Sequence, residues 1–146
     1  MDSLYLARGP VAEGFESWVS MAPLTQHQID GPLLASISRA VVRIVHEYTG
    51  RGPTKARTSI RDDVVVVMLQ ETLLKAEHSL IRDDKADQVV NMRRSFQQTM
   101  REDLSEAVAM LTERKVIAFM SDSHLEPDYS VELFVLAPEE EPEPAG

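Results

Sequence analysis

The sequence predicts an α+β domain, a two-layer sandwich in which a mainly antiparallel four-stranded sheet is covered on one face by helices. Two long segments repeat apolar residues every three or four positions, as amphipathic helices do. Two pairs of short apolar segments are joined by polar turns, which is typical of hairpins. Together with one shorter helical segment they give the order α-β-β-α-α-β-β, which suits two packed layers.

Length and composition predict a single domain with less ordered ends. The chain has 146 residues, of which 43% are hydrophobic and 27% charged, and these values are ordinary for a globular protein with one core. We expect the domain to cover residues 27–137, between a partly disordered arm at 1–26 and a disordered acidic, proline-rich tail at 138–146. Three apolar residues of the arm are spaced by three and would form one face of a short helix that docks on the domain or on a partner: Phe15, Trp18 and Met21.

Charge and cysteine content exclude several classes of function. The net charge of −9 falls to −3 over residues 27–137, which hold 17 acidic and 14 basic residues, so the domain lacks the basic excess of most nucleic-acid-binding proteins. A chain without cysteine has no disulfide, thiolate metal site or thiol nucleophile. No apolar run approaches the roughly 20 residues of a transmembrane helix, and no leader sequence is recognisable. We therefore expect a cytoplasmic protein with no transmembrane segment and no nucleic-acid partner.

The first helix is predicted by a stripe of apolar residues that runs from Ile29 to Tyr48 at steps of three or four. Two starts are consistent with the sequence, a capping box at residues 25–28 and Asp30 ahead of a Gly-Pro pair. Gly50 ends the helix because, without a Cβ atom, it adopts the left-handed conformation at little cost.

A hairpin and a short helix follow the first helix. Residues 55–60 and 64–69 are predicted strands joined by a polar turn, and the second strand is apolar along its whole length, as a central strand is. Thr72 is the predicted cap of a short helix that reaches Ile81.

The longest helix is predicted over residues 87–114, where six apolar residues lie in one line: Met92, Phe96, Met100, Leu104, Val108 and Leu111. Its length of roughly 42 Å exceeds the width of a small sheet. We therefore expect part of this helix to project or to pack against a second copy, which favours a homo-oligomer. A final hairpin has strands at 116–120 and 131–136 around a polar loop at 122–128.

The basic segment Gly50–Arg61 is the best candidate for a ligand site. It holds no acidic residue, and its candidate ligand-binding residues are Arg51, Gly52, Lys55, Arg57 and Arg61. Backbone amides at a glycine turn and nearby guanidinium groups can bind a carboxylate or a phosphate. The alternative is that strand alternation turns the side chains at 55, 57 and 59 to solvent as an ordinary polar face.

The histidines and the last loop give weaker candidates. The four histidines show none of the spacings that are typical of metal sites, and we predict no metal, no cofactor and no catalytic residue. His124 and Asp128 share the polar loop at 122–128 and form a candidate functional loop, where a side-chain proton could be transferred.

Several separated motifs resemble one small bacterial family, formerly a domain of unknown function. It is named for the soluble third component (MpsC-like) of a Na+-translocating membrane-potential-generating system, and the resemblance covers about residues 27–138. The motifs are Gly50–Ala56, Asp62-Asp63, Ala76-Glu77, Phe96–Arg101, Arg114–Ser121, His124, Pro127-Asp128 and Val131–Leu136.

The resemblance implies a cytosolic accessory protein of a membrane system for cation or inorganic-carbon transport, held at the inner membrane through a protein partner. It identifies no catalytic residue. We rank three hypotheses. The first is a non-catalytic interaction protein of such a complex, and the second is a module that binds a small phosphate-like or nucleotide-like anion at Gly50–Arg61. The third is an enzyme with a loop site at His124 and Asp128.

Overall fold

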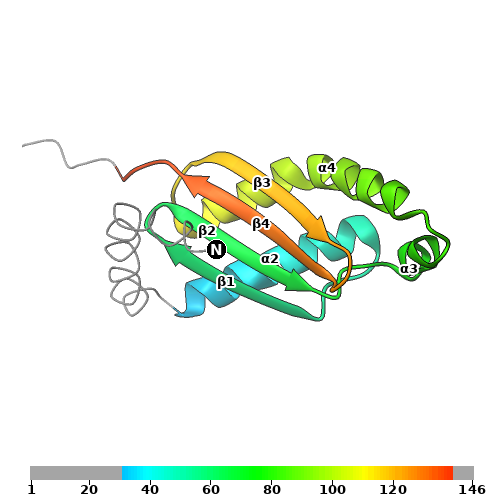
Figure 1. Cartoon of the computed structure of the whole chain (residues 1–146). Coiled ribbons are helices and arrows are strands. Elements are labelled where there is room, and N and C mark those ends of the chain that lie inside the picture. Colours follow the sequence, from blue (N-terminus) through cyan, green and yellow to red (C-terminus); the bar gives the residue numbers. More distant parts are fainter. Residues whose placement is uncertain (1–30, 140–146) are drawn as a thin grey trace, which may run out of the picture.

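A computed structural model describes residues 31–139, and in this range the chain forms three helices and a four-stranded sheet (Figure 1). The α+β class and the predicted order are confirmed. The apolar residues predicted in the arm, both proposed starts of the first helix and tail residues 140–146 lie outside the described residues. The elements are α2 (Gly31–Thr49), β1 (Lys55–Arg61), β2 (Val64–Gln70), α3 (Lys75–Arg82), α4 (Ala86–Thr112), β3 (Val116–His124) and β4 (Tyr129–Leu136).

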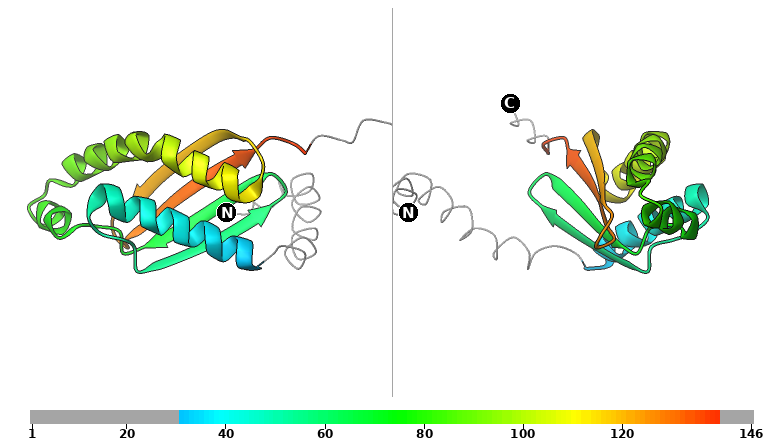
Figure 2. Two further views of the ribbon diagram at one scale, coloured as in Figure 1. Left: turned by 180° about the vertical axis from the view of Figure 1, so that it is seen from behind. Right: turned by 45° about the vertical axis from the view of Figure 1, so that its right-hand side comes forward.

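The sheet has the strand order β1-β2-β4-β3, and every neighbouring pair is antiparallel. The valine-rich β2 is an inner strand, as its uniformly apolar sequence indicates. α2 and α4 lie side by side across one face, which the view from behind shows (Figure 2). No element within residues 31–139 covers the opposite face, which we call the open face.

The hydrophobic core lies between the two long helices and the covered face of the sheet. Strand alternation sends every second side chain of β2 and β4 inward, and Phe134 is fully buried, with its ring centroid 5.3 Å from that of Phe119. Each fully buried aliphatic or aromatic side chain contributes about 1.5–3 kcal/mol. The other buried members of this core are Ile37, Val41, Ile44, Val45, Val65, Val67, Leu69, Met100, Leu104, Val108 and Leu136.

The long helix α4 follows the sheet and then extends beyond it. Its C-terminal half is buried on the strands, while its N-terminal half passes the end of the sheet, where α3 packs against it (Figure 1). The expected projection is therefore real, but α3 covers part of it. No helix in the described part of the chain is long and apolar enough to cross a bilayer.

Two details differ from the sequence-based expectations. Both strands of the last hairpin are longer than expected, so the loop between them shrinks to residues 125–128. The prediction that Thr72 caps the short helix is wrong. This helix begins at Lys75, and the carboxylate of Glu77 accepts the backbone N–H of Leu74 at 2.8 Å, so that the acid of the first turn satisfies the free amide.

Candidate functional site

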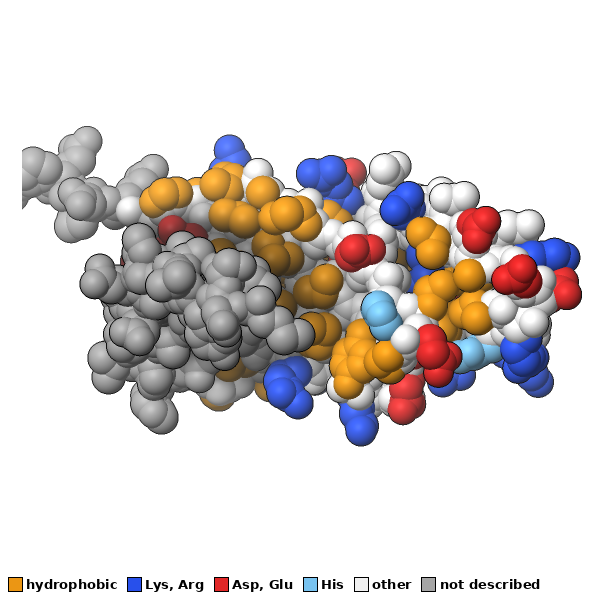
Figure 3. Space-filling model, in the orientation of Figure 1, with side chains coloured by type: hydrophobic (Ala, Val, Ile, Leu, Met, Phe, Trp, Pro, Cys, Tyr) orange, Lys and Arg blue, Asp and Glu red, His pale blue; other side chains and the backbone are white. Residues whose placement is uncertain are grey.

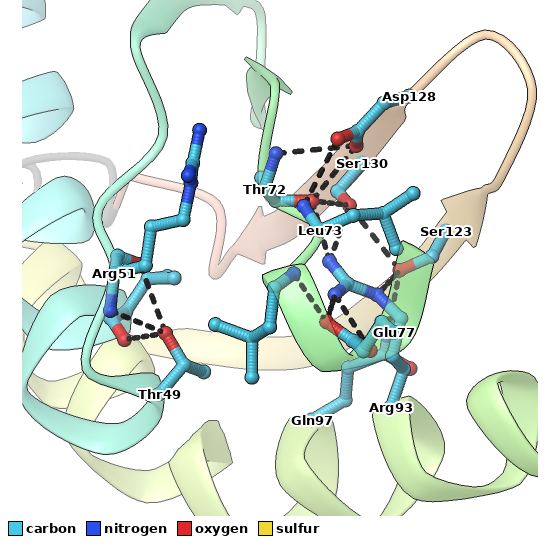
Figure 4. A network of polar contacts seen from close by, with 12 residues as sticks. Thr49, Arg51, Thr72, Leu73, Glu77, Arg93, Gln97, Ser123, Asp128 and Ser130 are labelled. Atoms are coloured by element: carbon cyan, nitrogen blue, oxygen red, sulfur yellow. Dashed lines mark hydrogen bonds and ion pairs between the residues drawn. The ribbon is translucent and has the colours of Figure 1, made fainter. Parts of the chain in front are cut away.

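The structure distributes the basic segment Gly50–Arg61 over separate places. Arg51 lies in the connection after α2, where its backbone bonds the hydroxyl of Thr49 (Figure 4). Gly52 packs close to α2, since a Cβ atom there would lie 3.4 Å from a methyl group of Val42. Lys55 and Arg57 belong to β1, at the opposite end of that strand from Arg61. The five predicted ligand-binding residues therefore do not converge on one point.

A groove on the open face contains part of the basic segment. It has a volume of about 710 Å³ and lies over β1, β2 and the start of β4. No acidic residue lines it. The polar or polarisable side chains that line it are Thr54, Lys55, Arg57, Ser59, Met68, Gln70 and Tyr129. A groove of this composition is compatible with an anionic group, although only two of the five predicted residues take part.

The open face is apolar along its middle strands, unlike the solvated face of most two-layer sandwiches. Figure 3 shows hydrophobic side chains gathered over the strands on this side. Met68 of β2 and Met120 of β3 are 39% and 53% exposed. By strand alternation the same face carries the valines and the leucine that point away from the core: Val64, Val66, Val131, Leu133 and Val135.

A second unusual region lies on the covered side, where Arg93 of α4 is the centre of a buried polar cluster (Figure 4). Its guanidinium donates to the two carboxylate oxygens of Glu77 at 2.9 and 3.2 Å, and these side chains are only 13% and 2% exposed. The remaining nitrogens donate to three hydroxyl groups, those of Thr72, Ser123 and Ser130. We call these five residues the polar cluster. A buried ion pair is tolerated only when its other donors are satisfied, as they are here.

The loop before β4 is fastened to the polar cluster through Asp128. Its carboxylate accepts the backbone N–H groups of Thr72 and Leu73 at 3.1 and 2.9 Å, and also the Thr72 hydroxyl. His124 is engaged elsewhere, with its Nδ1 atom 2.8 Å from the carbonyl oxygen of Pro127. The polar atoms of the two predicted loop residues thus have different partners, and Asp128 holds two segments of the chain together.

Glu132 of β4 lies beside the polar cluster without joining it. The residue is 3% exposed, and its Oε2 atom has no hydrogen-bond partner among residues 31–139. Burial raises the pKa of Glu132 to about 7, while the nearby Ser121 hydroxyl and the Arg93 guanidinium lower it. The Ser121 hydroxyl is close enough to act on the pKa, but it makes no hydrogen bond of normal geometry. This carboxyl group therefore changes its protonation near neutral pH.

The cavity beside the polar cluster is small. About 30 Å³ is free between Glu132, Arg93, Gln97 and the surrounding apolar side chains, which is space for one or two water molecules. Within residues 31–139, no three histidine or acidic side chains are grouped so that they could hold a metal ion. The donors and acceptors of the cluster bond one another and link α3, α4 and both strands of the second hairpin.

The sequence reasoning missed the polar cluster, although a signal for it was present. Arg93 follows Val89 by four positions and precedes Met100 by seven, so it belongs to the buried stripe of the long helix. Glu132 lies two positions before Phe134 and therefore shares its inward face. A charged residue at an inward position of an otherwise apolar stripe is the pattern that predicts such a buried group.

Comparison with known proteins gives one family. The model of the family described as "Na+-translocating membrane potential-generating system (MpsC)" matches residues 30–138, which is more than half of the chain. No curated protein and no solved structure gives a significant match. Both the open face and the polar cluster lie inside the matched range.

Proposed function

Since the chain belongs to the MpsC family, we propose that it is a component of a Na+-translocating membrane potential-generating system and that it acts there by binding proteins, without catalysis of its own. The chain would work on the cytoplasmic side and reach the membrane through a protein partner. A more specific form of the same proposal is that this membrane system transports inorganic carbon.

The apolar open face is the observation that carries this proposal. Exposed apolar patches of this kind are typical of surfaces that bind other proteins, because burial removes their contact with water. Met68, Met120 and Tyr129 are exposed on it, and the valines beside them are half-buried. The polar cluster offers no comparable opening for a substrate, since its groups bond one another around a cavity of about 30 Å³.

Recovery from native membranes tests the proposal. The tagged full-length chain is crosslinked in cells of its own source, membranes are isolated, and the attached proteins are identified by mass spectrometry. We expect integral membrane proteins that move cations. A chain carrying Met68→Glu and Met120→Glu should lose them, whereas the matched change Met110→Glu, at an exposed methionine of α4, should keep them. Recovery of no membrane protein with the parent chain would contradict the proposal.

A functional readout complements the recovery experiment. Deletion of the gene is expected to lower the Na+-dependent part of the membrane potential, measured with a voltage-sensitive dye in the presence and absence of Na+. Expression of the parent chain should restore it. An unchanged potential in the deletion strain would count against membership in such a system.

Binding of a small anion is the second candidate function, favoured by the groove on the open face. Lys55 and Arg57 line this groove and no acid does, so the charged groups that a phosphate or a carboxylate would meet there are all positive. The binding is measured as the change in melting temperature of the purified chain when phosphate or a nucleotide is added. We expect a shift that Arg57→Gln removes and that Arg51→Gln leaves unchanged, because Arg51 lies outside the groove. Absence of any shift in the parent chain rejects this function.

A further inference from the structure

We infer that the open face binds a second copy of this chain, so that two sheets pack face to face about a two-fold axis that runs roughly along the strands. The inference builds on the proposed function, since it names one partner of the same surface, which a second copy and a membrane protein would occupy in turn. Met68 and Met120 would be covered in such a dimer, and the two helical layers would lie on the outside.

The residues of the open face form four rows across the sheet. The pairing register places Lys55, Gln70, Tyr129 and His124 in one row and Arg57, Met68, Val131 and Asp122 in the next. The third and fourth rows run from Ser59 to Met120 and from Arg61 to Ala118. Each row thus begins on β1, crosses the two middle strands and ends on β3, and in all rows but the first the residues of the middle strands are apolar.

Charge is distributed unequally between the two edges of this face. Lys55, Arg57 and Arg61 are on β1, whereas the carboxylate of Asp122 is on β3, at the other edge. Among residues 31–139, neither Lys55 nor Arg57 forms an ion pair, and Asp122 has no cationic partner either. The face is therefore apolar in the middle, with cations at the β1 edge and a carboxylate at the β3 edge.

A two-fold axis along the strands pairs these edges. Such an axis lays β1 of one copy over β3 of the other and keeps each row opposite the same row. Arg57 of each copy then faces Asp122 of the other copy. The apolar residues of β2 in one copy face those of β4 in the other. Symmetric dimers need a surface that is complementary to itself in this way. Sheets that pack in a sandwich are usually inclined by about 30°, which a slightly tilted axis produces.

The other in-plane axis is unfavourable. An axis across the strands would lay β1 on β1 of the second copy with its direction reversed. Arg57 would then face Ser59 and Asp122 would face Met120, so neither charge would meet one of opposite sign. A carboxylate buried against a methionine costs free energy. The distribution of charge thus selects one orientation.

The size of the face can be judged from its strands. Four strands spaced by about 4.8 Å and seven residues long cover roughly 19 by 23 Å, or about 440 Å² in projection. A standard interface takes roughly 800 Å² from each partner, so the face corresponds to a small interface and to a dimer whose mass depends on protein concentration.

Light scattering of the full-length chain after size-exclusion chromatography tests the dimer. We expect twice the chain mass of 16.4 kDa. Met68→Glu and Met120→Glu should give the monomer mass, and Met110→Glu should remain a dimer, with circular dichroism confirming that each variant is folded. A monomeric parent chain at every concentration overturns the inference. The same holds if Met110→Glu dissociates the dimer and the two open-face variants do not, because α4 would then be the interface.

Charge exchange tests the orientation. Arg57→Glu and Asp122→Arg are each expected to raise the dissociation constant about 30-fold, because two symmetric ion pairs become like-charge pairs. The double variant should restore the parent value to within a few-fold. If both single variants associate like the parent chain, the stated orientation is wrong. A monomer in solution together with recovered membrane partners would reject the dimer and leave the proposed function intact.

Discussion

In most folded proteins apolar side chains are buried and charged side chains are exposed, and two regions of this molecule show the reverse. They are the open face and the polar cluster. On the open face, Met68 and Met120 are apolar and exposed, whereas in the polar cluster Arg93 and Glu77 are charged and buried. The cluster has partners inside its own chain for nearly every polar atom. The open face has no cover within residues 31–139.

This difference indicates which region holds the fold and which faces outward. Arg93 joins α4 to α3 and to both strands of the second hairpin, so the cluster fixes elements that are distant in the sequence. The apolar side chains of the open face pack under no other element within residues 31–139. We therefore expect changes in the cluster to affect stability and changes on the open face to affect association.

The largest effect is expected for Arg93→Met. This change leaves the Glu77 carboxylate buried without its partner, which costs about 3–5 kcal/mol of the free energy of unfolding. Arg94→Met is the control at the next position, where the side chain is exposed, and it should change stability by less than about 0.5 kcal/mol. Urea denaturation followed by circular dichroism measures both. Equal losses in the two variants would mean that the ion pair does not hold the cluster.

A smaller, pH-dependent effect is expected for Glu132→Gln. The pKa of Glu132 in the folded chain is about 7 and its ordinary value is 4.5, so its contribution to stability is present below pH 4.5 and is lost as pH rises to 7. Between pH 5 and pH 8, the free energy of unfolding of the parent chain should therefore fall by about 2–3 kcal/mol relative to that of the variant. Denaturation curves of both chains at the two pH values measure this difference. The exposed Glu106→Gln is the control, and a parent chain that follows the same pH dependence as Glu132→Gln would contradict the raised pKa.

The smallest effect is expected for Met120→Ala on the open face. Below the concentration at which the chain associates, this truncation should change the free energy of unfolding by less than about 0.5 kcal/mol. The matching truncation Met100→Ala in the core, where the side chain is 4% exposed, should cost about 2–5 kcal/mol. Similar losses at the two positions would show that part of the same chain covers the open face.

The fold could be predicted from the sequence because its periodicities are regular. Apolar residues at steps of three or four in α2 and α4, and the valines of β2, gave the order of the elements and the inner position of β2. The start of α3 was misplaced because Thr72 has the side chain of a typical cap, yet its hydroxyl is bonded to Asp128 and Arg93. A tertiary contact overrides a local preference in such cases.

The candidate sites were harder to predict because they depend on contacts between distant segments. Glu77 and Arg93 are 16 positions apart, and Thr72 and Asp128 are 56 apart, so no local pattern joins them. The basic segment was recognisable as a run of charges. Which of its members share a surface depends on strand register, and the register places Lys55 and Arg57 in the groove without Arg51.

Site-specific photocrosslinking in living cells tests the central claim, that the open face is a protein-binding surface, most directly. A photoreactive residue replaces Met120 on the open face in one strain and Met110 on α4 in another, both exposed methionines. The account predicts crosslinked products from position 120, with a species of twice the chain mass among them, and few or none from position 110. Products from position 110 alone, or from neither position, would contradict it.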